Sequence, residues 1–209
     1  MPTTIPQKSQ ILIVGGGSSG GVLGILLSEL GFDVSLVDTR DPTLPFLPDS
    51  RAFALVRGAW RVLEAAGVAQ KLIDEAEPLL SMEAHDANGV LPPAASLFGV
   101  DDLPDSDRGE PLGYMIEVDL LNNAIRERVQ QCEAIKLYAP NSVTALATGP
   151  DCARVTLDDG TELQADLVIG ADGVGSAIRD LAGIRTIGWS YEQAVVAVTL
   201  QLDQPHHGA

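Results

Sequence analysis

The chain has 209 residues, of which 45% are hydrophobic and 20% are charged, the balance of a soluble globular protein. Lys and Arg total 13 against 29 Asp and Glu, which gives a formal net charge of −16. This charge repels nucleic acid and anionic lipid, so we expect no nucleic-acid partner, and any anionic ligand must rely on local hydrogen-bond donors.

Residues 11–38 predict a strand, a helix and a second strand in close succession. Residues 11–14 are a continuous apolar run, as expected for a parallel strand that is buried on both faces. Gly31 ends the helical pattern, and residues 34–37 form the second strand. The apolar stripe of the helix is expected to consist of Leu23, Leu26, Leu27 and Leu30. We therefore expect a right-handed βαβ unit.

A second helix is expected after Asp49 or Ser50, either of which can cap it. Its apolar stripe would consist of Phe53, Val56, Trp60 and Leu63. Residues 79–100 carry mixed strand and turn signals, including Asn88–Gly89. Residues 101–111 hold five acids and two prolines, and we expect them to be a solvated loop.

The pattern changes in the second half of the chain. Residues 114–117 predict a strand, and Asp119 can cap the helix that follows, whose apolar residues are Leu121, Ala124, Ile125 and Val129. Residues 143–147 and 153–157 predict strands, and Asp159–Gly160 predicts a tight hairpin turn.

A buried strand is expected to return at residues 167–170 and to run into a helix from about Gly175. Residues 194–202 have the composition of one further strand.

The glycines after the first strand have the spacing of a dinucleotide-binding turn, GxGxxG. Gly15 allows the sharp turn, Gly17 lets a pyrophosphate approach the backbone, and Gly20 lets the helix pack against the sheet. The first-turn amides near Ser19 would then point at the phosphates. Asp38, at the end of the second strand, can accept both ribose hydroxyls of an adenosine. The alternative is a glycine-rich turn without a ligand.

Two features favour FAD over NAD. Gly24 extends the spacing to GxGxxGxxxG, which allows a very close helix crossing. The segment "DLVIGADGVGSAIR" contains Asp172–Gly173 and resembles the class A flavoprotein monooxygenases, the para-hydroxybenzoate hydroxylase group. The segments "DSRAFALVRGAWRVLEAAGV", "LGYMIEVDLLNNAI" and "WSYEQAVVAVTLQLDQPHHGA" narrow the resemblance to the ubiquinone-biosynthesis hydroxylases.

The resemblance implies roles for particular residues. It makes Gly15, Gly17, Ser19 and Gly20 the pyrophosphate loop and Asp38 the ribose acid, where Glu is commoner in the family. Arg51 would lie against the flavin's diphosphate, although it could instead be a solvated arginine. Asp172 and Gly173 would touch bound nucleotide and shape the approach of NADPH, with a simple turn as the alternative. Arg179 could equally be a surface charge, and no catalytic acid or base can be named.

The implied fold class is α/β: a Rossmann-like FAD-binding domain with an added antiparallel β hairpin, followed by the start of a truncated substrate domain. We expect the FAD-binding domain at residues 1–185, with 79–111 contributing to the substrate-domain side. Residues 186–209 would hold the first strand of the substrate domain. Family members run to roughly twice this length.

The implied function is that of the N-terminal part of an FAD-dependent monooxygenase. NADPH or NADH would reduce the flavin, and O₂ would supply the oxygen that hydroxylates a (poly)prenylated phenol in ubiquinone biosynthesis. We expect this chain alone to bind FAD weakly or not at all, to be inactive, and to self-associate through uncovered apolar surface. The full-length protein would associate peripherally with a membrane or a biosynthetic complex. A non-catalytic nucleotide-binding module, a remnant, and a flavin-dependent isoprenoid reductase remain alternatives.

The remaining signals concern location and metals. The first ten residues lack the apolar core of a signal peptide, and no run approaches the ~18 apolar residues of a membrane span. Cys132 and Cys152 lie too far apart for a CxxC site, so we expect reduced thiols in a cytoplasmic protein. His85, His206 and His207 lack metal-ligand spacing, and we expect no metal site.

Overall fold

The computed structural model describes residues 7–47, 49, 51–84, 95–194, 196 and 203. The chain divides into two compact units. The first unit comprises Met1–Leu47 and Asn122–Ala194, and the second comprises Pro48–Leu121 and Val195–Ala209. The domain boundary expected at residues 185 and 186 stays a prediction.

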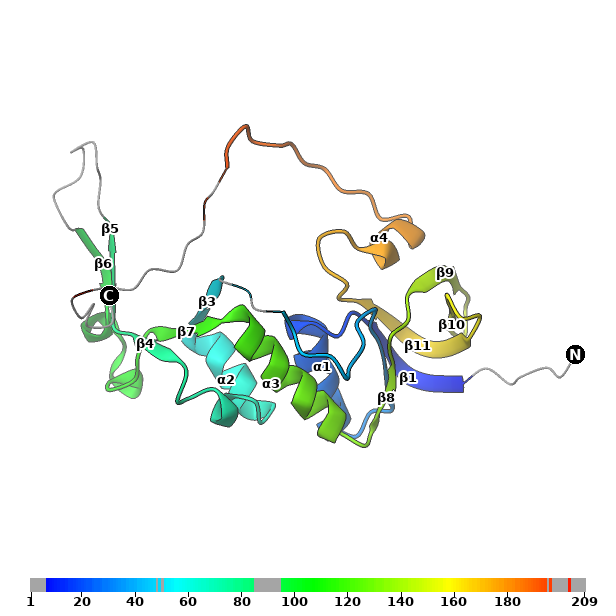
Figure 1. Ribbon diagram of the computed structural model, residues 1–209, viewed down its shortest axis with the longest axis horizontal. Coiled ribbons are helices and arrows are strands. Elements are labelled where there is room, and N and C mark those ends of the chain that lie inside the picture. Colours follow the sequence, from blue (N-terminus) through cyan, green and yellow to red (C-terminus); the bar gives the residue numbers. More distant parts are fainter. Residues whose placement is uncertain are drawn as a thin grey trace, which may run out of the picture. The chain divides into compact units, whose positions relative to one another are not determined.

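The first unit is built on a six-stranded sheet with the order β8-β2-β1-β11-β10-β9 (Figure 1). The strands are β1 (Gln7–Val14), β2 (Val34–Val37), β8 (Ile135–Tyr138), β9 (Val143–Thr148), β10 (Ala153–Leu157) and β11 (Glu162–Gly170). The first four in sheet order run parallel, and β10 and β9 are antiparallel to their neighbours. The expected α/β class with an added antiparallel hairpin is confirmed.

Helix α1 (Ser18–Glu29) follows β1 and leads into β2, so the predicted strand, glycine turn, helix and strand are confirmed. The predicted leucine stripe is wrong. The leucines are half-buried or exposed, whereas Val22, Ile25 and Ser28 are buried together with Gly20, Gly21 and Gly24. The buried face of α1 is thus rich in small residues, which let the helix lie close to its neighbours.

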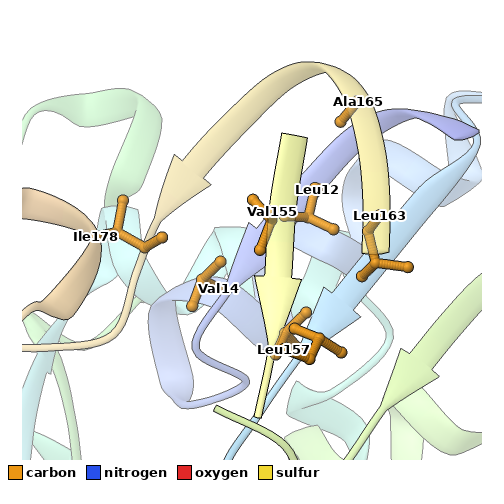
Figure 2. Packing of buried hydrophobic residues seen from close by; sticks show 8 residues of the cluster. Leu12, Val14, Val155, Leu157, Leu163, Ala165 and Ile178 are labelled. Carbon is orange, nitrogen blue, oxygen red and sulfur yellow. The ribbon is translucent and has the colours of Figure 1, made fainter. Parts of the chain in front are cut away.

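The hairpin between β10 and β11 turns at Gly160, which has the positive φ of +84° that favours glycine. Its strands contribute half of a cluster of eight buried apolar residues shown in Figure 2: Leu12, Val14, Val37, Val155, Leu157, Leu163, Ala165 and Ile178. The last of these lies on the short helix α4 (Ala177–Leu181), so α4 is anchored on the sheet through its one buried side chain.

The second half of β11 is not the buried strand that its apolar run predicts. Leu167 is 52% exposed. The cause lies in the pairing, because β10 covers only residues 162–165 of β11. Along residues 166–170, β1 is the only strand of the described chain that pairs with β11.

The second unit contains two small sheets, one of order β3-β7-β4 and one that pairs β5 with β6. Their strands are β3 (Ala52–Val56), β4 (Glu77–Leu79), β5 (Ser81–Ala84), β6 (Ala95–Gly99) and β7 (Gly113–Glu117). The helices are α2 (Arg57–Ala65), the first turn of α3 (Val118–Gln131), and the 3-10 turns η1 (Ala69–Lys71), η2 (Val100–Asp102) and η3 (Asp105–Asp107).

The helix expected from residue 49 or 50 begins later than predicted. Residues 52–56 form β3, which pairs antiparallel with β7, and α2 starts only at Arg57. Phe53 and Val56 are accordingly exposed rather than on a core stripe. Trp60 is buried as predicted, and the centroid of its ring lies 4.1 Å from the ring centroid of Tyr114 on β7.

Two further expectations in this unit need correction. The acidic loop is not merely solvated, because Asp107 accepts a 2.5 Å hydrogen bond from Arg57 and pairs with Arg61 as well. Asp119 does not precede α3 as a cap but lies inside its first turn, since the helix begins at Val118.

Several expectations fall on residues outside the described ranges. They are the Asn88–Gly89 turn, the three histidines and most of the strand expected at 194–202. Among the helices that the structure describes, none is long and apolar enough to cross a membrane.

Candidate functional site

The turns that follow β1, β2 and β11 meet at one edge of the sheet. The register places Val14 opposite both Val37 and Gly170, so the three strands end in one row. Gly15 donates a 2.8 Å hydrogen bond to the carbonyl of Val37, and Ala171 donates one of 2.7 Å to that of Val14. The carboxyl edge of a parallel sheet is where ligands of open α/β folds bind.

Two of the glycines are required by close backbone approach. Gly15 has a φ of +103°, and a Cβ there would lie 2.4 Å from the carbonyl oxygen of Ala171. A Cβ at Gly20 would lie 1.9 Å from the carbonyl oxygen of Gly15. These residues therefore let the turn, the helix and the loop after β11 pack together, as the glycine spacing predicts for Gly15 and Gly20.

Gly17 differs from both, because a Cβ on it would meet no atom of the described chain within 4 Å. It is the N-cap of α1, and it offers no side-chain hydrogen bond to the first turn, which also contains no acidic residue. The amides of that turn precede the first intrahelical bond, from Gly21 to the carbonyl of Gly17. Open space beside uncapped amides at the positive end of a helix suits a phosphate group.

Asp38 stands directly after β2, next to this turn. Its Oδ2 accepts a 2.5 Å hydrogen bond from the amide of Gly16, and its Oδ1 accepts one of 2.7 Å from the amide of Arg40. A carboxylate has about four lone-pair positions, so Asp38 keeps acceptor capacity beyond these two bonds. Its predicted place at the carboxyl end of β2 is confirmed.

The loop after Asp38 is fastened to α3 by side chains that sequence reasoning missed. Asn123 accepts a hydrogen bond from the amide of Phe46, Arg126 donates to the carbonyl of Leu44, and Gln130 donates to that of Pro42. These polar residues lie three and four positions apart, so the helical spacing of Asn123, Arg126 and Gln130 was the available signal. Arg40 also stacks over the ring of Phe46, 4.4 Å from its centroid.

Asp172 lies at the carboxyl end of β11, on the same edge as Gly15, as predicted. Its carboxylate accepts hydrogen bonds from the Ser176 hydroxyl, at 2.5 Å, and from the Ile178 amide, at 3.1 Å. Burial acts to raise the pKa of Asp172, but the bonds from Ser176 and Ile178 outweigh it, and the pKa lies below its ordinary value. Gly173 has a φ of +88°, which lets the loop turn toward α4.

The very close helix crossing that the spacing predicts at Gly24 occurs at another glycine. A Cβ at Gly24 would make only ordinary contacts, the nearest at 3.6 Å from Ile13. A Cβ at Gly21 would lie 2.5 Å from Cγ2 of Ile125 on α3. The close helix approach therefore occurs at Gly21, which the GxGxxGxxxG spacing does not include.

Arg51 belongs to the second unit, where its guanidinium forms a two-pronged ion pair with Asp49. The Arg51 side chain is 67% exposed. The hydrogen bonds from the Arg51 side chain and amide lower the pKa of Asp49 to about 2. Contact between Arg51 and a flavin diphosphate stays a prediction.

Two pockets in the described part of the structure lie away from the glycine turn. One, of about 820 Å³ in the second unit, is lined by Leu80, Glu110 and Tyr114 among others. The other, of about 460 Å³, lies between β11 and α4, where Leu167 and Arg179 contribute to its walls. Neither pocket is lined by a residue of the Gly15–Gly20 turn.

Comparison with known proteins assigns the chain a family. The model of a family described as an FAD binding domain matches residues 8–207. The ubiquinone hydroxylase UbiL of Rhodospirillum rubrum is 34% identical over 206 residues, which cover 97% of this chain and 46% of that protein. The 3-demethoxyubiquinol 3-hydroxylase of Escherichia coli is 31% identical over 202 residues, covering 94% and 49%. The chain thus spans about half the length of these curated relatives.

Solved structures support the fold. The p-nitrophenol 4-monooxygenase PnpA from Pseudomonas putida aligns with a TM-score of 0.76 at 19% identity, over 90% of this chain and 46% of that one. The flavin-dependent monooxygenase PieE, solved with FAD and substrate, aligns with a TM-score of 0.69 at 22% identity, over 88% and 34%. At these identities the likeness speaks for the fold alone.

Proposed function

Since the chain belongs to the FAD binding domain family, we propose that it is the FAD-holding part of a flavin-dependent hydroxylase that acts on a phenolic precursor of ubiquinone. The observation that carries the proposal is the convergence at one sheet edge of an uncapped helix terminus at Gly17, the Asp38 carboxylate and the loop at Asp172.

The residues at this edge fit the ADP part of FAD. We assign the pyrophosphate to the turn formed by Gly15, Gly17, Ser19 and Gly20, where free amides and a missing Cβ leave room for an anion. We assign the ribose hydroxyls to Asp38, which is held in place by the Gly16 and Arg40 amides. The overall charge of −16 makes these local donors necessary, because the mean field repels a diphosphate.

The chemistry belongs to the cofactor, and this chain supplies binding and orientation. When bound, FAD would supply the redox chemistry, in which two electrons from NADPH or NADH and one oxygen atom of O₂ hydroxylate the phenol ring while the other oxygen atom leaves as water. The Gly15–Gly20 turn and Asp38 would fix the adenosine end. We further propose that the Arg51 guanidinium serves as a two-pronged donor to the diphosphate.

The substrate class rests on the relatives that match most of this chain. One is named a ubiquinone hydroxylase and another a 3-demethoxyubiquinol 3-hydroxylase. The proposed substrates are accordingly a ubiquinone-type phenol and O₂.

Two experiments test the proposal. Calorimetric titration of the purified chain should give saturable binding of ADP and weak binding of FAD at the same site, so that ADP displaces FAD. Absence of binding by both ligands would refute the assignment of the cofactor. The substrate class is tested by expressing the full gene in a bacterial strain that lacks its own ubiquinone hydroxylase. We expect this strain to make the hydroxylated quinone again. If the strain makes no hydroxylated quinone, the substrate class is rejected, and the cofactor assignment is unaffected.

A further inference from the structure

Two backbone amides fix the direction of the Asp38 carboxylate. The Gly16 amide, 22 positions earlier, donates to Oδ2 at 2.5 Å, and the Arg40 amide donates to Oδ1 at 2.7 Å. The bond from Arg40 joins residues two positions apart, in a turn that the short side chains of Asp and Asn form readily. Both carboxylate oxygens are therefore held in place by the chain itself.

The main chain of Asp38 is held as well, by the segment that follows β8. The Asp38 amide donates a 3.1 Å hydrogen bond to the carbonyl of Tyr138, and the Asp38 carbonyl accepts one of 2.8 Å from the amide of Asn141. Because main chain and carboxylate are both fixed, the single methylene of an aspartate spans the gap between them. A glutamate has one methylene more, and it could reach both amides only by folding back or by moving the main chain.

Gly16 limits the same carboxylate from the side of the glycine turn. A Cβ at Gly16 would lie 2.9 Å from Oδ2 of Asp38 and 3.3 Å from its Cβ. The first distance is well below van der Waals contact, so any side chain at residue 16 must displace the carboxylate. Gly16 fills a variable position of the GxGxxG spacing, and the spacing therefore gives it no role.

We propose that Gly16 is a specificity-determining residue, whose amide and missing Cβ place the Asp38 carboxylate so that this site binds a ribose with aspartate and loses affinity with glutamate. The inference rests on the proposed function, because the ribose belongs to the ADP part of FAD. It explains why the shorter acid stands here although Glu is commoner in the family. Each carboxylate oxygen keeps a lone pair besides its amide bond, so the pair can accept from the 2′- and the 3′-hydroxyl.

Two nucleotides that differ by one ribose hydroxyl test the proposal. Calorimetric titration with ADP and with 2′-deoxy-ADP gives an affinity ratio that reports on the ribose contact, and the wild type should prefer ADP by about tenfold or more. Asp38→Glu and Gly16→Ala should each weaken ADP binding by about fivefold or more and bring the ratio down to about threefold or less. Gly17→Ala, the matched control on the same turn, should weaken both nucleotides alike and leave the ratio unchanged, because its Cβ would meet the phosphate rather than the sugar.

Asp38→Glu decides the proposal even if Gly16→Ala fails to fold. A glutamate variant that bound ADP as tightly as the wild type, with the same preference over 2′-deoxy-ADP, would overturn this inference and leave the proposed function standing. If the wild type bound neither ADP nor FAD, the proposed function would fail and the ribose role with it.

NMR of the chain without ligand supplies a second readout. A short hydrogen bond to a carboxylate should place the Gly16 amide proton downfield in the wild type, and Asp38→Glu should move this resonance upfield. A Gly16 resonance that stays in place in Asp38→Glu would show that the longer acid keeps the bond, and the proposed dependence on aspartate would be overturned.

Discussion

The amide of Gly16 donates a 2.5 Å hydrogen bond to Oδ2 of Asp38, which joins the glycine turn to the end of the neighbouring strand. The bond spans 22 positions in sequence and fixes the carboxylate before any ligand arrives. Such prior ordering lowers the entropic cost of binding. Asp38 therefore acts both on the turn and, by our proposal, on the ribose.

Replacement of Asp38 tests this double role. Asp38→Ala should weaken binding of FAD and ADP by about 1.5–3 kcal/mol, the range for hydrogen bonds to a charged group, or roughly 10- to 150-fold. Asp38→Asn should lose less, since its side-chain oxygen can still accept from Gly16. Calorimetric titration of the three proteins measures the difference, and wild-type affinity in Asp38→Ala would contradict the ribose assignment.

The glycines of the turn should separate folding from binding. Gly17→Ala places its Cβ in open space at a φ of −69°, which alanine readily adopts, so the loss of stability should stay within about 1 kcal/mol, the cost of alanine at an N-cap, while FAD and ADP binding falls. Gly20→Ala drives a Cβ into the Gly15 carbonyl and should destabilise the fold by about 1–3 kcal/mol or more, the cost of overpacking.

Gly58 on α2 provides the matched control. Its Cβ would also meet no described atom within 4 Å, and alanine favours a helix, so Gly58→Ala should preserve both stability and binding. Urea denaturation and titration of the three variants test the contrast. Full FAD affinity in Gly17→Ala would show that no phosphate lies against this residue.

Local patterns predicted the site's framework because its elements are close in sequence. The apolar run of β1, the three glycines and the acid after β2 all lie within residues 11–38, and each constrains its neighbours directly. The leucine stripe failed for α1 because periodicity counts bulky residues, whereas packing against Ile125 requires the small Gly21. That contact depends on a residue about a hundred positions away, which no local pattern contains.

A contact with a distant segment also explains why residues 52–56 form β3 rather than the predicted helix. Residues 52–56 have apolar positions that suit a helix, but antiparallel pairing with β7 supplies five opposed residue pairs and makes the segment a strand. The sequence from Asp49 onward shows the helix signal alone, because its partner strand lies some sixty residues later. Tertiary pairing therefore overrode a local preference.

The ion pair of Arg57 with Asp107 should matter more for stability than the other pairs of the acidic loop. The Arg57 and Asp107 side chains are 19% and 16% exposed, whereas Asp105, which pairs with Arg108, is 88% exposed. Asp107→Ala leaves a largely buried guanidinium without this partner and should lower the free energy of unfolding by about 1.5–3 kcal/mol. Asp105→Ala, the matched control, should change it by less than about 1 kcal/mol. Equal effects in urea denaturation would contradict the ranking.

The pair of Arg51 with Asp49 predicts a pH dependence. Because hydrogen bonds from Arg51 lower the pKa of Asp49 to about 2, from an ordinary value of 3.8, the carboxylate favours the folded state at pH values above about 4. This contribution is lost as the pH falls toward 2. Carboxyl-carbon NMR should show the Asp49 pKa returning toward 3.8 in Arg51→Ala. The pKa of Asp158, which the Ser142 hydroxyl lowers independently, should not move.

The same pair offers a direct test of whether Arg51 reaches the cofactor. The Arg51 guanidinium gives its Nε–H and one Nη2–H to Asp49, and its remaining N–H groups can bind a diphosphate. Binding there would redistribute the charge of a guanidinium that also serves Asp49. At pH 6, addition of FAD should therefore shift the Arg51 Nε–H resonance and the Asp49 carboxyl-carbon resonance together. Arg51→Lys, which retains the charge but loses the paired donors, should bind FAD less tightly than the wild type. If both resonances stay in place while FAD saturates the protein, Arg51 remains with Asp49 and does not contact the diphosphate.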